Sequence, residues 1–329
     1  MEKKTGSETN RELISIIIPA YNAERYVARC LESCVRQTYE HIEVIVINDG
    51  STDGTERIVK EYTERDSRIK LIESENKGVS SARNLGIDNA KGTYLSFVDA
   101  DDELEDDAMA VLYGKAKEYG ADVTIGNHRF MDEDSGNVSD NDPYSEQLWK
   151  GEQALIALLE DHPATYSMCA KLFRKEIIRE TRLVTGRKIH EDSYFNFLIF
   201  AKKPKVVVCD DYVYIIHNTS GSASRGEFSD KYLDILYFME QKKAYIRESF
   251  PHLSDYLVKM ELKADMAFLA VAYRADRNKY KKVIQQCINF VNGNRDAFVP
   301  QNEDNKKLFF IITHHMYSIY SVLAKMLHR

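Results

Sequence analysis

The chain lacks several features that would assign it to common classes of protein. No stretch reaches the ~18 consecutive apolar residues of a membrane-spanning helix, and residues 1–10 are polar, without the apolar core of a secretory leader. The five cysteines are scattered, odd in number and without zinc-site spacing, a pattern that fits a reducing compartment. The net charge of −7 leaves no excess of cations for a general nucleic-acid binder. We therefore expect a cytoplasmic protein with no nucleic-acid partner.

Two glycine-rich phosphate-binding motifs are also missing. No G-x-G-x-x-G follows the first predicted strand, and no G-x-x-x-x-G-K-[ST] occurs anywhere. Dinucleotide-binding and P-loop folds therefore lose support. A sugar-1-phosphate nucleotidyltransferase would also need a glycine-rich loop at this place, where the chain has Pro19-Ala20-Tyr21-Asn22 instead.

The first half of the chain alternates between β-branched runs and segments of helical period. This alternation predicts an α/β fold with right-handed crossovers and a mostly parallel sheet covered by helices on both faces. The predicted strands are 14–18, 44–47, 69–72, 94–98 and 122–125. The predicted helices are 23–37, a helix that is capped by Ser51 or Asp53 and runs to about residue 65, 79–90 and 104–119.

The second half is less regular. Residues 131–144 are rich in Asp, Asn, Ser and Gly and predict an exposed loop. Residues 149–224 mix helices with short strands, and the chain is helical from about residue 228. We therefore expect a disordered tail at 1–12, an α/β domain at 13–225 and a helical domain at 226–329.

Three polar loops directly follow predicted strands, and ligands bind beyond the carboxyl ends of such strands. The loop with Asp99, Asp101 and Asp102 packs carboxylates that repel each other unless a cation offsets them. Hard divalent cations prefer such oxygen ligands and bridge them to phosphates. The alternative is that Asp102 and Glu103 only open the next helix, where acids favour the helix dipole.

A second loop, Asn48-Asp49-Gly50-Ser51-Thr52-Asp53, has the residues of a tight turn into a helix. Asp49 follows a strand, as acids that bind a ribose do in nucleotide-binding folds. Tyr21, in the first loop, offers a flat face for stacking on a base. The alternative for the second loop is a turn with no ligand.

Together these segments resemble the family 2 glycosyltransferases of the GT-A fold. The resemblance covers roughly residues 14–125. It is carried, in order, by Ile16-Ile17-Ile18-Pro19-Ala20-Tyr21-Asn22, Val46-Ile47-Asn48-Asp49-Gly50-Ser51-Thr52-Asp53-Gly54, Asn76-Lys77-Gly78 with Ala82-Arg83-Asn84, and Phe97-Val98-Asp99-Ala100-Asp101-Asp102.

The resemblance implies a Rossmann-like domain that binds a nucleotide sugar, and it implies roles by position. The donor-binding residues would be Pro19, Tyr21, Asn22, Asp49, Arg83, Asp99, Asp101 and His217. Asp49 would contact the base, Arg83 the nucleotide, and Asp99 the ribose or the metal side. Asp101 would bind Mn2+ or Mg2+ on the donor diphosphate. Residues 217–225 would close over that diphosphate, with His217 as a metal or phosphate contact; the alternative is that His217 is a loop residue without a role. The family commonly uses UDP-sugars, which makes UDP the expected nucleotide.

His190-Glu191-Asp192 opens an apolar helix and resembles the family's Glu-Asp pair, whose Asp is the catalytic base. An inverting transfer needs a carboxylate to take the proton of the acceptor hydroxyl. The alternative is that both acids only favour a helix N-terminus. Residues 170–175 also resemble a family segment, but Ala170 stands where the family usually has Asn.

The last segment, 305–329, contains no acid and carries an apolar stripe at Ile312, Met316, Ile319, Leu323 and Met326. A basic amphipathic helix of this kind can lie on an anionic membrane surface. The same stripe can equally pack on other helices or on a second subunit. Both alternatives stay open, with the inner face of the membrane as the expected surface.

We therefore expect a metal-dependent inverting hexosyl- or N-acetylhexosaminyltransferase. Its acceptor would be a saccharide, a lipid-linked saccharide or a cell-surface polymer, as in polysaccharide biosynthesis. The alternative is a non-catalytic module of the same fold that binds a nucleotide sugar or a glycan. The presence of Asp99, Asp101 and Asp192 together argues for the enzyme.

Overall fold

The computed structural model describes residues 11–133, 135–140, 142–218, 228–272, 277–298, 303–314 and 316–317. The chain divides into two compact units. Unit 1 comprises residues 1–155, 163–186 and 195–221, and unit 2 comprises 156–162, 187–194 and 222–329. The predicted tail and the predicted boundary at 226 fall largely on residues outside the described ranges.

The elements follow in the order β1 (Ile14–Ala20), α1 (Val27–Val35), β2 (Ile42–Asp49), α2 (Thr55–Arg65), β3 (Ile69–Ser74), α3 (Val79–Asn89), β4 (Tyr94–Phe97), β5 (Glu103–Leu104), α4 (Ala108–Tyr119), β6 (Val123–Asp132), β7 (Val138–Asp140), β8 (Gln147–Trp149), α5 (Gln153–Leu159), η1 (Pro163–Thr165), β9 (Lys171–Arg174), α6 (Lys175–Ile178), α7 (Glu191–Phe200), β10 (Val206–Asn218), η2 (Asp230–Tyr232), α8 (Leu233–Ser249), η3 (Pro251–Leu253), α9 (Asp255–Ala272), α10 (Arg277–Gly293), η4 (Arg295–Ala297) and α11 (Glu303–Thr313).

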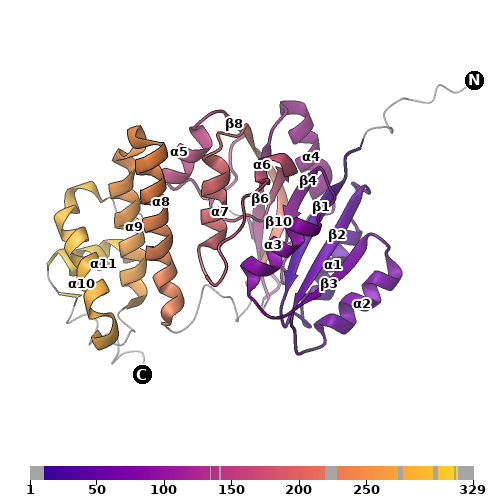
Figure 1. Ribbon diagram of the computed structural model, residues 1–329, viewed down its shortest axis with the longest axis horizontal. Helices are drawn as coiled ribbons and strands as arrows, with labels where there is room; N and C mark the ends of the chain where they lie inside the picture. The colour runs from indigo at the N-terminus through magenta and orange to yellow at the C-terminus, as the bar shows by residue number, and fades with distance from the viewer. Residues whose placement is uncertain are drawn as a thin grey trace, which may run out of the picture. The chain divides into compact units, whose positions relative to one another are not determined.

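Unit 1 is built on one mixed sheet with the strand order β3-β2-β1-β4-β9-β6-β10-β5, while β7 pairs with β6 and β8 with β10. Strands β3, β2, β1 and β4 are parallel, as predicted, and β1 to β3 lie side by side in Figure 1. Strand β9 is antiparallel to both β4 and β6. The α/β fold with a C-terminal helical region is confirmed.

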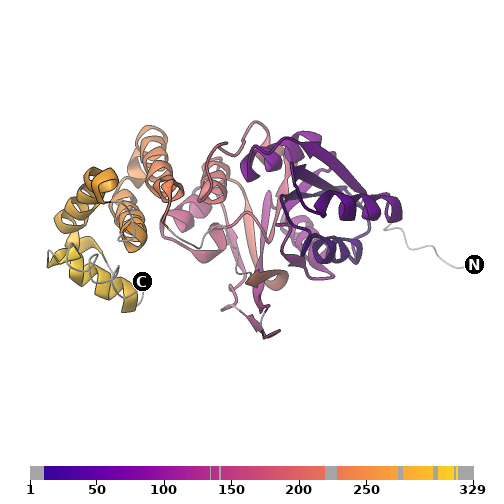
Figure 2. The same ribbon diagram turned by 90° about the horizontal axis from the view of Figure 1, so that it is seen from below.

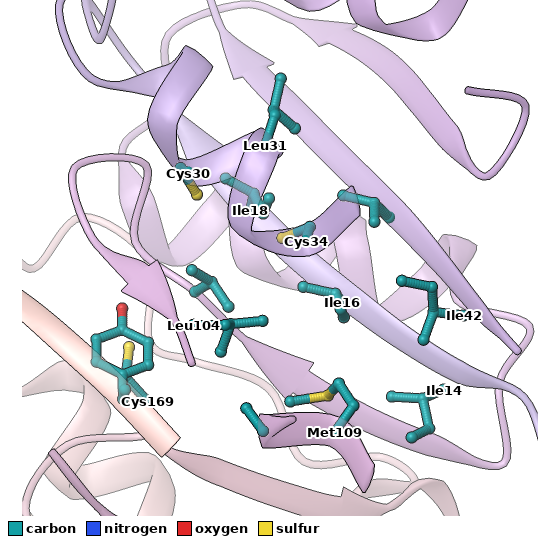
Figure 3. Packing of buried hydrophobic residues seen from close by; sticks show 14 of the residues in the cluster. Ile14, Ile16, Ile18, Cys30, Leu31, Cys34, Ile42, Leu104, Met109 and Cys169 are labelled. Atoms are coloured by element: carbon teal, nitrogen blue, oxygen red, sulfur yellow. The ribbon is translucent and has the colours of Figure 1, made fainter. Parts of the chain in front are cut away.

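The alternation along β1 decides which helices cover which face of the sheet. Ile16 and Ile18 pack in one buried cluster with residues of α1, α2 and α4, and Figure 3 shows this packing against Cys34 of α1. The intervening Ile17 faces α3 on the other side. A Cβ added to Gly86 of α3 would lie 2.3 Å from Ile17 Cγ2, so glycine permits this close approach.

Two sequence expectations were wrong in detail. The predicted helix at 104–119 begins only at Ala108, because Glu103 and Leu104 form β5 and pair with β10. The predicted loop at 131–144 contains the end of β6 and all of β7, which pair as a hairpin. In both places a long-range or hairpin pairing overrides the local pattern.

Unit 2 is mainly the helices α8 to α11, which gather as a bundle (orange to yellow in Figure 2) around buried residues such as Leu262, Phe268 and Val291. Two short segments from earlier in the chain, 156–162 and 187–194, belong to it. In the described part of the chain, no helix combines the length and the apolar character needed to cross a membrane. Of the predicted apolar stripe, Ile312 is buried and Met316 is exposed; Ile319, Leu323 and Met326 lie outside the described residues.

Candidate active site

The loops after β1 and β2 are hydrogen-bonded to each other at the carboxyl edge of the sheet. Asn22, with a left-handed φ of 48°, donates its backbone N–H to Ser51 Oγ (3.0 Å). Its side-chain oxygen accepts the backbone N–H of Thr52 (2.8 Å). Pro19 lies in β1 beside Ile47 of β2. Asn22 therefore joins the two loops, and the neighbouring Tyr21 is left 51% exposed at this edge.

Asp49, the last residue of β2, orders the loop that leads into α3. Its carboxylate accepts the backbone N–H groups of Lys77 (2.9 Å) and Gly78 (2.8 Å), and the hydroxyl of Ser74 (3.3 Å). Gly50 has φ +71°, and a Cβ there would lie 2.8 Å from a backbone nitrogen of the same loop. Asp49 thus has a structural role that the sequence analysis missed, and its contact with a base stays a prediction.

Asp99 is held from three sides after β4. Arg83 Nη2 of α3 donates to Asp99 Oδ1 (2.8 Å). The backbone N–H of Asp99 donates to the hydroxyl oxygen of Tyr214 (3.0 Å), and Cys169 Sγ lies 3.6 Å from Oδ2. The Arg83 side chain is 6% exposed and that of Asp99 is 38% exposed. The buried guanidinium group of Arg83 therefore holds the carboxylate of Asp99, which reaches solvent.

We define the acidic loop as Asp99, Asp101 and Asp102. The carboxylates of these residues repel each other when they are ionised. Burial raises the pKa of Asp101, and the charge of Asp99 raises it further. Burial, followed by the charges of Asp99 and Asp101, raises the pKa of Asp102 to about 8. Asp102 accepts hydrogen bonds from the Tyr214 hydroxyl (2.9 Å) and the His217 backbone N–H (2.9 Å). These two hydrogen bonds attach the acidic loop to β10.

His217, near the end of β10, lies between two other acids. Its Nε2 is 2.9 Å from Glu103 Oε1, and its Nδ1 is 3.2 Å from Glu133 Oε1. Arg29 of α1 joins the same group, because it donates to Glu133 (2.7 Å) and to the backbone oxygen of Asp101 (2.8 Å). In this geometry both ring nitrogens of His217 face carboxylates, and its predicted contact with a metal stays a prediction.

The donor groups of the acidic loop fit a hard divalent cation. Among the described residues, no group of three or more His, Cys, Asp or Glu side chains is arranged to hold a metal by itself. Mg2+-like ions are usually bound by one or two carboxylates together with substrate phosphates and water. Asp99 and Asp101 repel each other, and a cation beside them would relieve that repulsion.

Residues 170–175, which resemble a family segment, contain one strand of the sheet. Lys171–Arg174 is β9, and the backbone oxygen of Ala170 accepts the N–H of Gly126 (2.9 Å). Ala170 has φ 55°, a left-handed conformation that Asn and Gly adopt more readily than Ala. This backbone conformation gives a physical reason for the Asn that the resembling family usually has at this place.

Asp192 belongs to unit 2, at the first turn of α7. Its Oδ1 accepts the backbone N–H of Ser193 (2.6 Å). His190, the residue directly before α7, has a left-handed φ of 64°. Burial lowers the pKa of His190, and the charge of Lys242 lowers it further. The segment 219–225, predicted to cover a diphosphate, lies outside the described residues.

Several residues of these networks gave no signal in the sequence. Tyr214, Arg29 and Glu133 contact the acidic loop or His217, but each reaches it from a distant part of the chain. The alternation of β10 could only have placed Tyr214 on a buried face.

Comparison with known proteins gives consistent matches. The family described as Glycosyl transferase family 2 matches residues 15–182. Glycosyltransferase GlyA of Streptococcus pneumoniae is 38% identical over 219 residues, which are 64% of this chain and 31% of GlyA. The matched part of the chain thus spans about a third of that relative.

Two solved structures are similar in fold. Staphylococcus aureus TarS, residues 1–349, in complex with UDP-GlcNAc aligns with a TM-score of 0.65 at 19% identity, covering 96% of this chain and 91% of the other. The mannosyltransferase PcManGT of Pyrobaculum calidifontis, in complex with GDP-Man and Mn2+, aligns with a TM-score of 0.56 at 16% identity, covering 98% and 89%.

Proposed function

Because this chain belongs to glycosyltransferase family 2, we propose that it transfers a hexose or an N-acetylhexosamine from a UDP-sugar to a hydroxyl group, with inversion at the anomeric carbon. The acceptor is a saccharide, a lipid-linked saccharide or a cell-surface polymer. The enzyme works in the cytoplasm, and residues 305–329 contact either the inner face of the membrane or a second subunit.

The observation that carries this proposal is the acidic loop itself. It follows β4 at the carboxyl edge of parallel strands, where open α/β sheets bind their ligands. Arg83 supports one of its carboxylates, and the pKa of Asp101 is raised by burial and by Asp99. Acids with raised pKa at such an edge are typical of a functional site. TarS, of similar fold, was solved with UDP-GlcNAc.

The donor is proposed to bind along this edge. Exposed Tyr21 offers an aromatic face to the base, and Pro19 and Asn22 shape the same loop. Asp49 keeps the neighbouring loop in place and is proposed to contact the base. Arg83 contributes positive charge on the nucleotide side.

Asp101 would hold Mn2+ or Mg2+, with Asp99 beside it and His217 as a further contact. When bound, the metal supplies positive charge that offsets the charge developing on the leaving diphosphate. The neighbouring Asp102 resists ionisation because it is buried beside two other acids. Asp102 therefore keeps the acidic loop attached to β10 while its neighbours face the ligand.

Asp192 is proposed as the general base. Its carboxylate accepts the proton of the acceptor hydroxyl while that oxygen attacks the anomeric carbon, and the bond from this carbon to the diphosphate breaks. Attack from the side opposite the leaving group inverts the configuration. The hydrogen bond from the Ser193 N–H fixes Oδ1 of Asp192, which limits the orientations of the base.

The test is the release of UDP from a panel of UDP-sugars in the presence of acceptor saccharides, with and without Mn2+. We expect one donor to give Mn2+-dependent release, and Asp192→Asn to abolish it while donor binding persists. If Asp192→Asn turns over as fast as the wild type, Asp192 is not the base. If no nucleotide sugar binds under any condition, the proposal is wrong as a whole.

A further inference from the structure

Unit 2 contains a buried lysine that the proposed chemistry does not use. Lys242 lies on α8 and is 8% exposed. Burying an ammonium group costs several kcal/mol unless hydrogen bonds and opposite charges compensate for the lost water. A lysine kept at such a position therefore needs partners, and they identify what it does.

The hydrogen-bonding partner of Lys242 is the residue after the proposed base. Lys242 Nζ donates to Ser193 Oγ at 3.1 Å. The backbone N–H of the same serine donates to Asp192 Oδ1 at 2.6 Å. Ser193 therefore connects the ammonium of α8 to the carboxylate at the first turn of α7, with its hydroxyl on one side and its amide on the other.

The charges around Lys242 point to the same carboxylate. The charges of Asp192 and Asp161 favour the ammonium form of Lys242. His190 is a basic group close to Lys242, and the charge of Lys242 disfavours protonation of His190. Asp161 already pairs with Lys263 of α9 at 2.6 Å. The charge that Lys242 contributes is therefore balanced mainly by Asp192.

The other charged groups near this position have partners of their own. Asp234 of α8 accepts from Arg187 Nη1 (2.8 Å) and from the backbone N–H of Lys188 (2.8 Å). Lys243, the next residue of α8, pairs with Glu240 and, on α9, with Glu261 (2.7 Å). Lys243 is thus a matched neighbour that is also mostly buried but serves a different pair of acids.

We propose that Lys242 is a positioning residue that keeps Asp192 oriented to accept the proton of the acceptor hydroxyl. This inference rests on the proposed role of Asp192 as the base. No bond to Lys242 forms or breaks. Its hydrogen bond to Ser193 holds the turn that carries the Asp192 carboxylate, and this bond requires the Lys242 side chain at its buried position.

The pH dependence of turnover distinguishes this role from a purely structural one. Burial lowers the pKa of Lys242 to about 8, so its charge is present below about pH 8 and is lost as the pH rises through that value. The alkaline limb of the kcat profile therefore reports loss of the Lys242 charge. Arginine at this position stays charged throughout.

The experiment compares kcat and KM against pH for the wild type, Lys242→Met, Lys242→Arg, Ser193→Ala and the control Lys243→Met. For Lys242→Met we expect kcat to fall by about tenfold, the size of one lost hydrogen bond to a charged group, with the KM for donor unchanged. We expect Lys242→Arg to retain turnover and to lose the alkaline limb. Ser193→Ala should lower kcat in the same direction as Lys242→Met.

Lys243→Met should keep the wild-type profile, because it changes only the pairing with Glu240 and Glu261. If Lys242→Met or, should that variant not fold, Ser193→Ala has the wild-type kcat, the inference is overturned. An alkaline limb that persists in Lys242→Arg also overturns it. If Asp192→Asn retains transfer, the proposed base fails first, so the two failures are distinguishable.

Discussion

Replacing Asp102 by Asn tests whether the acidic loop holds a buried proton. The folded state holds that proton up to about pH 8, because burial and the charges of Asp99 and Asp101 raise the pKa of Asp102 to about 8. In the unfolded chain an aspartate loses its proton near pH ~4. Between these values the folded state binds one more proton than the unfolded state, so rising pH must destabilise the wild type.

The magnitude follows from the linkage. One proton of difference lowers the free energy of unfolding by about 1.4 kcal/mol for each pH unit between about pH 4 and about pH 8. Asparagine carries no titrating proton, and it keeps an oxygen for the His217 N–H and an amide group for the Tyr214 hydroxyl oxygen. Relative to the wild type, Asp102→Asn should therefore gain about 1.4 kcal/mol for each unit of rising pH.

The assay is urea unfolding at several pH values, followed by the fluorescence of Trp149. This is the one tryptophan of the chain, it is buried in β8, and it belongs to unit 1 with Asp102. Asp210→Asn on β10 is the control, because it makes the same substitution at an exposed position. Parallel pH dependences of Asp102→Asn and the wild type would refute the reasoning.

Three further variants test other parts of unit 1 by the same unfolding assay. Arg83→Met removes the hydrogen-bond donor that lies 2.8 Å from Asp99. We expect the free energy of unfolding to fall by about 1–2 kcal/mol, a loss reduced by the exposure of Asp99, and UDP binding to weaken. Unchanged UDP binding would show that Arg83 is not part of the donor site. Asp49→Asn places an amide group opposite backbone N–H donors, which should lower the free energy of unfolding by about 2–3 kcal/mol. An unchanged free energy of unfolding would contradict the role of Asp49 in ordering the loop. Ala170→Gly relieves a φ of 55° and should stabilise unit 1 by about 0.5–1 kcal/mol, whereas a destabilised variant would show that the Ala170 side chain contributes more than its strain costs.

The strands and the loops that follow them could be predicted because their signals are local. β-branched runs give β1 and β2, and the polar residues at their ends give the candidate site. The register then brings the ends of β1, β2 and β4 to one edge, as the rule for parallel sheets requires. Asp99 and Asp101 could be singled out for the same reason.

The supporting residues could not be predicted because their contacts are distant in the chain. Tyr214 contacts Asp102 across 112 residues, and this pairing exists only because β10 reaches the acidic loop. Glu103 has the composition of a helix start, but pairing with β10 makes it part of a strand. Lys242 is a charged residue in a helix, a position where the sequence alone suggests a solvated surface, and only the packing of unit 2 buries it.

The most direct test of the central claim is calorimetric titration of UDP into the wild type, Asp101→Ala and Asp192→Asn, each with and without Mn2+. The proposal predicts that Mn2+ strengthens UDP binding to the wild type and to Asp192→Asn, and that Asp101→Ala loses this gain. Equal Mn2+ dependence in Asp101→Ala and the wild type would contradict the account, because the acidic loop would then not hold the metal with the donor diphosphate.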